Sequence, residues 1–578
     1  MTSTRAQQST ALPQEVSRGV RDTWWYVGAV VLGGVLCVLA ALNQPFNQNE
    51  LKQIGPYGSN DLSTITSGTR QPPLDPLLGS LVQHLLGEGQ LRQRLVPVLA
   101  GIGTLVVMAL LLRKLGLGLS GAFALWTMAT APLLVRYSAY TRPYALPLFL
   151  SVLFVYAGQR WLDDRRKWWL AVACLAATGL PLSRVPEPTI FLATTAATVT
   201  AMAWRGRLVW SLAWPLAAIP LAALATVGYP MYRSLAGQSE NIWDPSISGV
   251  IDRFPTGVEE IYNGLLPLLA EWMPWWPFTL LVVIAAFVVP AARRRLLQWW
   301  FVWPLLAAPV VFVLAYHFMN PFPFDIRPYR PRMAMFFVPG IGLMVAALAA
   351  TVAEATAWPG RVRVGVGAFL AAVLVGQLPG TASVLLENEA ADFEQAAYVL
   401  THDLPPDAIV LYDTASRIGR WHQPFTAKAR YMDDKPFVAQ MSTLPSKANR
   451  VPKDGPVYLL FLDSECAFSV VCDEPPAPWD GQVDGWRIAK RFDKFTLYES
   501  DRPLIGRAGA ITALRDFADS LGPDYGALET FAAAALLKLQ GRPAEGQRLI
   551  HQLYAEASPE LEARIKRNAE ADGLDPFA

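Results

Sequence analysis

The chain is poor in charge. Charged residues make up only 17% of its 578 positions, whereas hydrophobic residues make up 53%. An ordinary soluble chain has about 25% charged residues, so this composition excludes an ordinary soluble domain and is typical of a membrane protein. The net charge of +2 is too close to balance to favour a nucleic-acid partner.

Cysteine is also scarce, with four residues in the whole chain. Cys37 and Cys174 lie inside apolar runs, where we expect plain packing. Cys466 and Cys472 lie in the long tail after the last run, and an oxidising compartment would allow them to form a disulfide. Their spacing does not resemble a metal site.

A cleavable signal peptide is not evident either. Residues 1–23 are polar, and the apolar run that follows is long and lacks a small-residue cleavage site. We therefore expect this run to be retained as the first membrane helix.

Long apolar runs are what the chain has in abundance. A bilayer core needs about 20 residues of helix, and hydropathy predicts eleven spans of nearly this length. They lie near residues 25–42, 95–112, 118–135, 144–159, 168–181, 189–204, 208–229, 276–292, 298–316, 333–354 and 364–380.

Basic residues recur at every second turn between these spans, as in Arg113-Lys114, Arg165-Arg166-Lys167 and Arg293-Arg294-Arg295. The positive-inside rule puts those turns and the N-terminus in the cytoplasm. The loops 43–94, 136–143, 182–188, 230–275 and 317–332 then face outward, as does the tail. The expected location is the cell membrane, with many passes and an extracytoplasmic C-terminal domain.

The tail differs in pattern from the membrane region. Short strand-like runs at 408–412, 457–462 and 495–498 alternate with helical spacing and Pro, Asp and Gly, as in a small α/β domain. Helical periodicity returns at 527–539 and 544–554, which resembles one helical-repeat hairpin. We expect an N-terminal tail at 1–23, a membrane domain at 24–381, an α/β domain at 382–505 and a helical region at 506–578.

Acids in the first outward loop are candidates for proton transfer. Glu50 lies closest to the end of the first helix, followed by Asp61 and Asp75. A carboxylate there can accept a proton from an acceptor hydroxyl. For any single loop acid, a solvated surface role is the commoner explanation.

Arginines gather at the outward ends of the spans. Guanidinium groups bind phosphate in a bidentate manner, which suits a lipid phosphate, although contact with lipid headgroups explains single arginines as well. His317 is a further candidate, but a lone histidine is more often a packing residue. The arginines that we select for phosphate binding are Arg70, Arg142, Arg327 and Arg330.

Read in order, several segments resemble one family. After the acidic first loop come Gln71-Pro-Pro-Leu-Asp75, then Leu91-Arg-Gln-Arg-Leu-Val-Pro97, then Tyr137-Ser-Ala-Tyr-Thr-Arg-Pro-Tyr144. This order resembles the GT-C membrane glycosyltransferases, in particular the dolichyl- or polyprenyl-phosphate-mannose mannosyltransferase-like branch (family 39 and relatives). The resemblance covers about residues 25–415. It implies a polytopic all-α membrane domain of about 11 helices, followed here by the outward α/β domain and helical hairpin.

The chain departs from the family pattern at two acids. Asn49 stands where the family has the aspartate usually credited as base, and Tyr140 stands where it has a glutamate. An amide cannot take the proton, so Glu50 is the expected base, with Asp75 or Asp61 in reserve. Asn49, Tyr137, Tyr140, Tyr144 and His317 are the expected substrate contacts.

The resemblance implies an inverting glycosyltransferase that moves a sugar from a polyprenyl-phosphate donor to a hydroxyl on an envelope glycan, lipid or protein. The donor is a co-substrate, no cofactor is required, and a divalent metal is compatible with the site but not implied. Membrane lipids are expected partners and nucleic acid is not. Two alternatives stay open: a catalytically inactive relative that binds lipid-linked sugar or scaffolds an envelope complex, and a transporter of lipid-linked intermediates.

Overall fold

The computed structural model divides the chain into two compact units. The first holds residues 1–44 and 52–388, and the second holds residues 45–51 and 389–578. The structure describes residues 12–44, 50, 53–54, 56–67, 72–87, 89–230, 276–319, 335–355, 359–386, 399, 403–412, 437–441, 444, 448–462, 482–492, 495–572 and 575–577.

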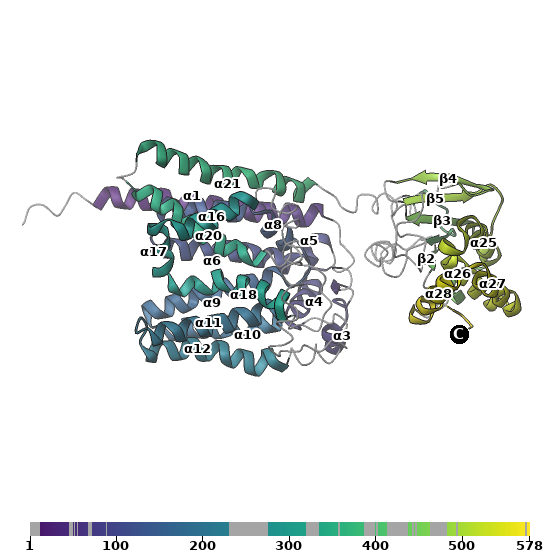
Figure 1. Cartoon of the computed structure of the whole chain (residues 1–578), viewed down its shortest axis with the longest axis horizontal. Coiled ribbons are helices and arrows are strands. Elements are labelled where there is room, and N and C mark those ends of the chain that lie inside the picture. Colours follow the sequence, from purple (N-terminus) through teal and green to yellow (C-terminus); the bar gives the residue numbers. More distant parts are fainter. Residues whose placement is uncertain are drawn as a thin grey trace, which may run out of the picture. The chain divides into compact units, whose positions relative to one another are not determined.

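The first unit is a bundle of apolar helices (Figure 1). Its helices are α1 (Leu12–Asn43), α3 (Leu62–Ser67), α4 (Leu74–Leu86), α5 (Gln90–Gln93), α6 (Leu95–Lys114), α7 (Gly118–Ala129), α8 (Pro132–Ser138), α9 (Ala145–Asp164), α10 (Lys167–Ser183), α11 (Pro186–Trp204), α12 (Trp210–Ala223), α16 (Trp276–Val288), α17 (Pro290–Gln298), α18 (Trp303–Met319), α20 (Val338–Glu354) and α21 (Gly360–Leu386). Short π or 3-10 turns occur at Leu224–Gly228, Trp300–Val302 and Met335–Phe337.

Each of the eleven predicted spans coincides with helix, but the count of eleven is not confirmed. Among the described residues, six helices are long and apolar enough to cross a membrane, or eight if two bent pairs each count as one span. The predicted span 118–135 is broken by 57° between α7 and α8. Pro132 causes this break, because proline at the start of α8 cannot donate the hydrogen bond that would continue α7. A second break, of 79°, separates α17 from α18.

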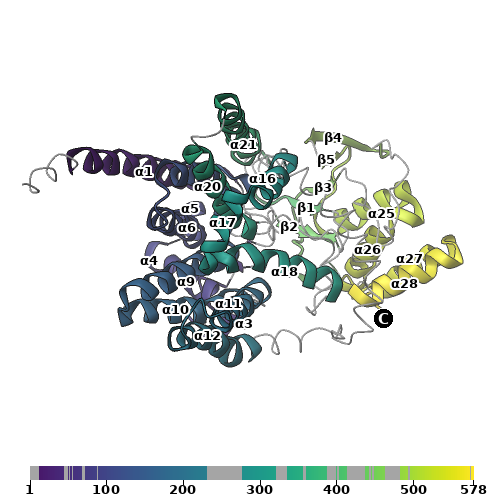
Figure 2. The ribbon, with the colours of Figure 1, turned by 60° about the vertical axis from the view of Figure 1, so that its left-hand side comes forward.

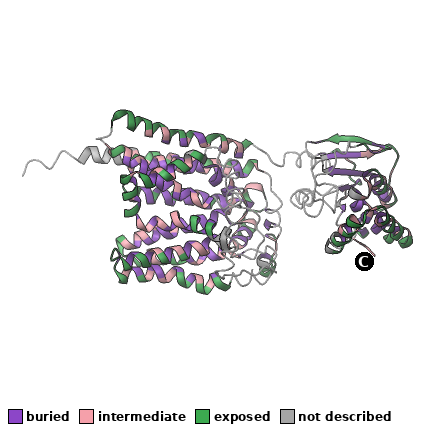
Figure 3. Ribbon diagram, in the orientation of Figure 1, coloured by how far each residue is buried: buried purple, intermediate pink, exposed green. Residues whose placement is uncertain are grey.

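Small residues allow the helices of the core to approach closely. A side-chain carbon added to Gly33 of α1 would lie within 3.1 Å of Ala129 in α7, and one added to Gly340 of α20 would meet the carbonyl oxygen of Leu305 at 2.9 Å. Glycine is therefore needed where these backbones cross. Buried residues line the inside of the bundle, whereas α21 is exposed along most of its length (Figure 3). Helices α9, α10, α11 and α12 lie together in both Figure 1 and Figure 2.

The basic turns share one end of the bundle, which we call the basic end. Lys114 at the end of α6 pairs with Asp163 at the end of α9, and Arg295 of α17 pairs with Glu354 at the end of α20. Trp161, Met202 and Leu208 form a small cluster that joins the turns after α9 and α11. Helices α3, α4, α5 and α8 lie at the opposite end, which we call the site end (Figure 1).

The second unit contains a five-stranded mixed sheet. Its strands are β1 (Ile409–Tyr412), β2 (Phe437–Gln440), β3 (Val457–Leu462), β4 (Trp486–Arg491) and β5 (Phe495–Ser500), in the order β2-β1-β3-β5-β4. The β1 strand pairs in parallel with β2 and β3, and the other two pairs are antiparallel. Strands β1, β3 and β5 lie where the sequence predicts strands; β2 and β4 were not predicted.

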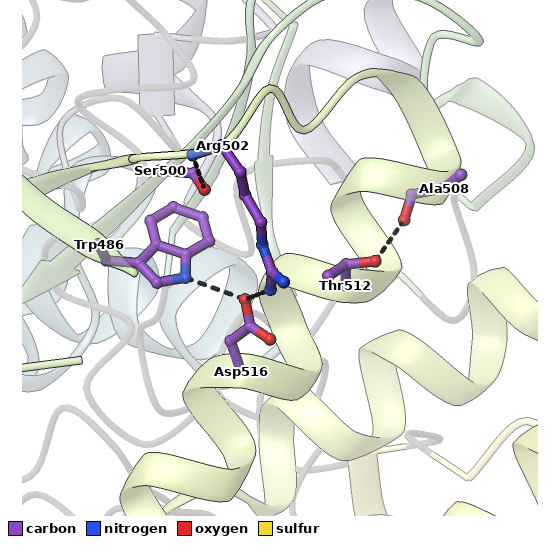
Figure 4. A network of polar contacts seen from close by, with 6 residues as sticks. All are labelled: Trp486, Ser500, Arg502, Ala508, Thr512 and Asp516. Atoms are coloured by element: carbon purple, nitrogen blue, oxygen red, sulfur yellow. Dashed lines mark hydrogen bonds and ion pairs between the residues drawn. The ribbon is translucent and has the colours of Figure 1, made fainter. Parts of the chain in front are cut away.

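Helix α25 (Gly506–Tyr525) covers one face of this sheet. Phe517 stacks on Phe461 of β3 with ring centroids 4.6 Å apart, and it contacts Trp486 of β4 edge-on. Asp516 accepts hydrogen bonds from the Trp486 indole at 3.1 Å and from Arg502 at 2.5 Å (Figure 4). Helices α26 (Ala527–Leu539), α27 (Pro543–Glu556) and α28 (Pro559–Asp572) complete the unit. The predicted fold class, a helical membrane domain followed by a small α/β domain and terminal helices, is confirmed.

Candidate active site

The start of α4 places an aspartate inside the protein. Pro72 and Pro73 precede the helix, and Asp75 lies in its first turn with only 2% of its surface exposed. The segment at residues 53–58 is held over this helix, because Ser80 donates a hydrogen bond to the Tyr57 carbonyl at 2.8 Å. The Tyr57 ring lies directly on Gly79, where any side chain would collide with it. This packing fixes Gln53 beside Asp75.

Gln53 connects Asp75 to an arginine from a distant part of the chain. Its side-chain amide donates a hydrogen bond to Asp75 Oδ2, and its Oε1 accepts one from Arg142 Nη1 at 3.4 Å. Arg142 lies in the turn between α8 and α9, where two tight backbone hydrogen bonds of 2.7 Å, from Arg142 to Tyr140 and from Tyr144 to Arg142, bend the chain. A carboxylate, an amide and a guanidinium therefore form one chain at the site end.

Two atoms of this Asp75–Gln53–Arg142 hydrogen-bonded series have no hydrogen-bond partner in the described part of the chain. Asp75 Oδ1 and Arg142 Nε are both buried, and neither has a hydrogen-bond partner among the described residues. Leaving such atoms unpaired costs about 1–3 kcal/mol each, and more for a charged group. One acceptor and one cationic donor are thus held ready for a further group.

Burial determines the protonation of Asp75, which lies outside the candidate spans. It raises the pKa of this carboxyl to about 7, while the charge of Arg142 and the Gln53 hydrogen bond act in the opposite direction. A carboxyl that titrates near neutrality suits a general base, because it can take up a proton and release it at the working pH.

A tyrosine cluster adjoins Arg142. The rings of Tyr137, Tyr140 and Tyr144 contact one another with centroids 5.4–6.2 Å apart. The Arg184 guanidinium lies 4.8 Å from the centre of the Tyr144 ring and pairs with Glu187 at 2.5 Å. Glu187 is 4% exposed. The tyrosine cluster therefore surrounds Arg142 in the sequence, and a buried ion pair packs against Tyr144.

The structure treats the three candidate acids differently. Asp61 is exposed and caps α3, accepting hydrogen bonds from the Ser63 backbone at 3.0 Å and the Thr64 hydroxyl at 2.7 Å. These bonds lower the pKa of Asp61 to about 2, so its structural role accounts for it. Glu50 is fully buried but belongs to the second unit, so the candidate site is built from residues of the first unit alone.

Other predicted site residues receive no structural description. Arg70, Arg327, Arg330, Asn49, Cys466 and Cys472 lie outside the described residues, and so does the side chain of His317. Within the described part of the chain, no group of three or more His, Cys, Asp or Glu side chains is placed to hold a metal ion.

Sequence reasoning missed Gln53, Glu187 and Arg94. Arg94 is fully buried after α5, and its Nη1 donates to the carbonyl oxygens of Ala41, at 2.9 Å, and Gln44. The only signal for Arg94 was its place in the Leu91–Pro97 segment that resembles the family pattern. Gln53 and Glu187 gave no signal, because a single glutamine or glutamate in a loop has no diagnostic spacing.

Residues 70–229 match the sequence profile of a family described as dolichyl-phosphate-mannose-protein mannosyltransferase. This segment contains Asp75, Arg142, the tyrosine cluster and Glu187. The resemblance read from the sequence is thereby confirmed over the part of the chain that builds the site end. No curated protein sequence matches the chain.

Solved structures that are similar to this chain include crystal structures of ArnT from Cupriavidus metallidurans, both bound to undecaprenyl phosphate and in the apo state. In each case the sequences are 13% identical, the similarity covers 82% of this chain and 98% of the other, and the TM-score is 0.48.

Proposed function

We propose that this protein is an integral-membrane glycosyltransferase that takes a sugar from a polyprenyl-phosphate donor. The family match over residues 70–229 supports this reaction class. The single observation that carries the proposal is the hydrogen-bonded series Asp75–Gln53–Arg142, in which a buried carboxyl and a guanidinium, each with a buried atom left unpaired among the described residues, are joined at one end of an apolar bundle.

In this proposal Asp75 is the general base. Its free Oδ1 accepts the proton of the acceptor hydroxyl while the hydroxyl oxygen forms a bond to the anomeric carbon of the sugar. The bond from that carbon to the phosphate oxygen breaks at the same time, and polyprenyl phosphate leaves. One in-line displacement of this kind inverts the configuration of the sugar.

Arg142 stabilises the leaving phosphate. Guanidinium binds phosphate oxygens through paired charge-assisted hydrogen bonds, and the Arg142 Nε is available for one of them. The negative charge grows on the phosphate as the glycosidic bond breaks, so a fixed cation at this position lowers the barrier. Arg70, Arg327 and Arg330 are proposed to assist, and Tyr137, Tyr140, Tyr144, Asn49 and His317 to contact the substrates.

We assign the site end to the outer face of the membrane and the basic end to the cytoplasm, following the positive-inside rule. The α/β domain and terminal helices are then extracytoplasmic, where they would position an acceptor hydroxyl on a glycan, lipid or protein.

A second candidate function rests on the replaced acids of the family pattern. With Asn49 and Tyr140 in place of carboxylates, the protein could bind a lipid-linked sugar without transferring it. Glu50 is the second candidate for the base.

A transfer assay separates these alternatives. The purified full-length protein in nanodiscs is offered a panel of radiolabelled polyprenyl-phosphate sugars with envelope extracts as acceptor. We expect turnover of one donor, lost in Asp75→Asn and Arg142→Gln and retained in the exposed-acid control Asp61→Asn. Loss in Glu50→Gln but not in Asp75→Asn would transfer the role of base to Glu50. Binding of a donor without turnover would identify an inactive relative.

A further inference from the structure

The basic end contains a hollow that the proposed reaction does not use. Its lining residues come from the corner where α16 turns into α17. Figure 1 shows α17 at the end of the bundle opposite to α4 and α8. Its volume is about 460 Å³, and it is lined by Val289, Pro290, Ala291, Arg294, Arg295 and Gln298.

Two arginines of this hollow have different environments. Arg295 is half-buried and pairs with Glu354, which compensates its charge and holds it against α20. Arg294 is exposed, and no carboxylate among the described residues pairs with it. The hollow therefore presents one fixed guanidinium and one uncompensated guanidinium on the same wall.

The apolar side of the hollow continues along α16. Leu281, Ile284 and Val288 are all exposed and follow one another at intervals of three and four residues, so they form a stripe on one face of the helix. The stripe ends at Val288, the last residue of α16, and the next residue, Val289, lines the hollow. Trp300 follows α17, as expected for a helix lying at headgroup level.

We propose that this corner binds an anionic phospholipid. The phosphodiester contacts Arg294 and Arg295, and one acyl chain lies along the Leu281–Ile284–Val288 stripe. A lipid fits this combination better than a free phosphate ion does, because the apolar stripe brings acyl chains directly beside the two arginines. The net positive charge of the wall selects an anionic headgroup over a zwitterionic one.

Lipid retention by the full-length protein tests this site without any measurement of sugar transfer. The protein is equilibrated in micelles that contain equal amounts of phosphatidylglycerol and phosphatidylcholine, and bound lipid is counted by native mass spectrometry. We expect phosphatidylglycerol to be retained selectively and Arg294→Gln to weaken its binding about fivefold, the effect of one cationic contact near a membrane surface.

Arg207→Gln is the matched control. Arg207 is equally exposed, lies in the basic turn after α11 and loses the same charge, but does not line the hollow. If Arg294→Gln and Arg207→Gln weaken phosphatidylglycerol binding equally, the effect is one of general surface charge and the proposal is overturned. Equal retention of the two lipids by the wild type would also overturn it. Inorganic phosphate at 20-fold excess over lipid (about the 10 mM range) should not displace phosphatidylglycerol; complete displacement would identify a free-anion site instead.

Discussion

The two ends of the helical bundle treat charge in opposite ways. At the basic end, some of the basic residues form partly exposed pairs with carboxylates at helix termini, as in Lys114–Asp163 and Arg160–Asp164. At the site end, Asp75, Glu187 and Arg94 are buried. Exposed ion pairs change the free energy of folding little, whereas buried charges carry a large desolvation penalty. A bundle needs charges of the first kind to be oriented in a membrane; charges of the second kind indicate a chemical or structural task.

The largest expected effect tests the task of Asp75. Asp75→Asn keeps the size of the side chain and removes the proton acceptor, so we expect the rate of sugar transfer to fall by about 10²–10³-fold. The measurement is kcat in the nanodisc assay. A fall of less than threefold would show that Asp75 is not the base, and Asp61→Asn, which removes an exposed acid, should leave kcat unchanged.

The same variant should gain stability, and the gain should depend on pH. The pKa of Asp75 is raised from 3.8 to about 7 in the folded protein, so the native state holds the proton more tightly than the unfolded state. The contribution of Asp75 to stability is therefore fully present below pH 4 and lost as the pH rises through 7. Asparagine is neutral like the protonated acid. We therefore expect the free energy of unfolding of Asp75→Asn at pH 8 to be higher than that of the wild type by up to about 4 kcal/mol.

Thermal unfolding in detergent at pH 4 and pH 8 measures this difference. The variant and the wild type should have the same unfolding temperature at pH 4, and the variant should have the higher unfolding temperature at pH 8. A constant difference between them would show that the carboxylate charge is not what burial penalises.

Arg94 tests whether a buried charge at the site end can be structural. Arg94→Met removes the donor to the Ala41 and Gln44 carbonyls and leaves those oxygens to find other partners. We expect the free energy of unfolding to fall by about 2–3 kcal/mol. Arg92→Met, which replaces an exposed arginine two residues earlier, is the control and should lie within about 0.5 kcal/mol of the wild type.

The smallest effect is expected at the basic end. Lys114→Gln breaks the partly exposed pair with Asp163, and the free energy of unfolding should fall by only about 0.2–1 kcal/mol. A loss as large as that of Arg94→Met, measured under the same conditions, would remove the contrast between the two ends.

Much of the fold follows from local patterns. Apolar runs predict where the helices lie, since a helix in lipid must satisfy its own backbone hydrogen bonds. Pro132 in the run 118–135 was a local signal for the bend after Ala129, but hydropathy averages across it. Strand β4 escaped prediction because all but one of its described residues are exposed, so it lacks the apolar alternation of a half-buried strand.

The candidate site could be predicted from the sequence only in part. The order of motifs indicated Arg142 for phosphate binding and offered Asp75 only as a reserve for Glu50. Asp75 and Arg142 are 67 positions apart in the chain and are joined in the structure. The order of motifs could not reveal that Gln53 joins them, because that contact depends on how Tyr57 and Gly79 pack. Nor could it separate Asp61 from Asp75: two acids in one loop look alike until one is found capping a helix in water and the other inside the protein.

The end of α1 has a consequence for biosynthesis. Its last carbonyls are bound by Arg94, and Asn43 and Gln44 in turn donate to the carbonyls of Leu385 and Val384 at the end of α21. At about 5–20 residues per second, a ribosome needs several seconds to reach Arg94 and tens of seconds to reach Leu385 after completing α1. The first helix must therefore wait in the membrane without these partners, and the bundle is closed by α21, the last of its described helices to be made.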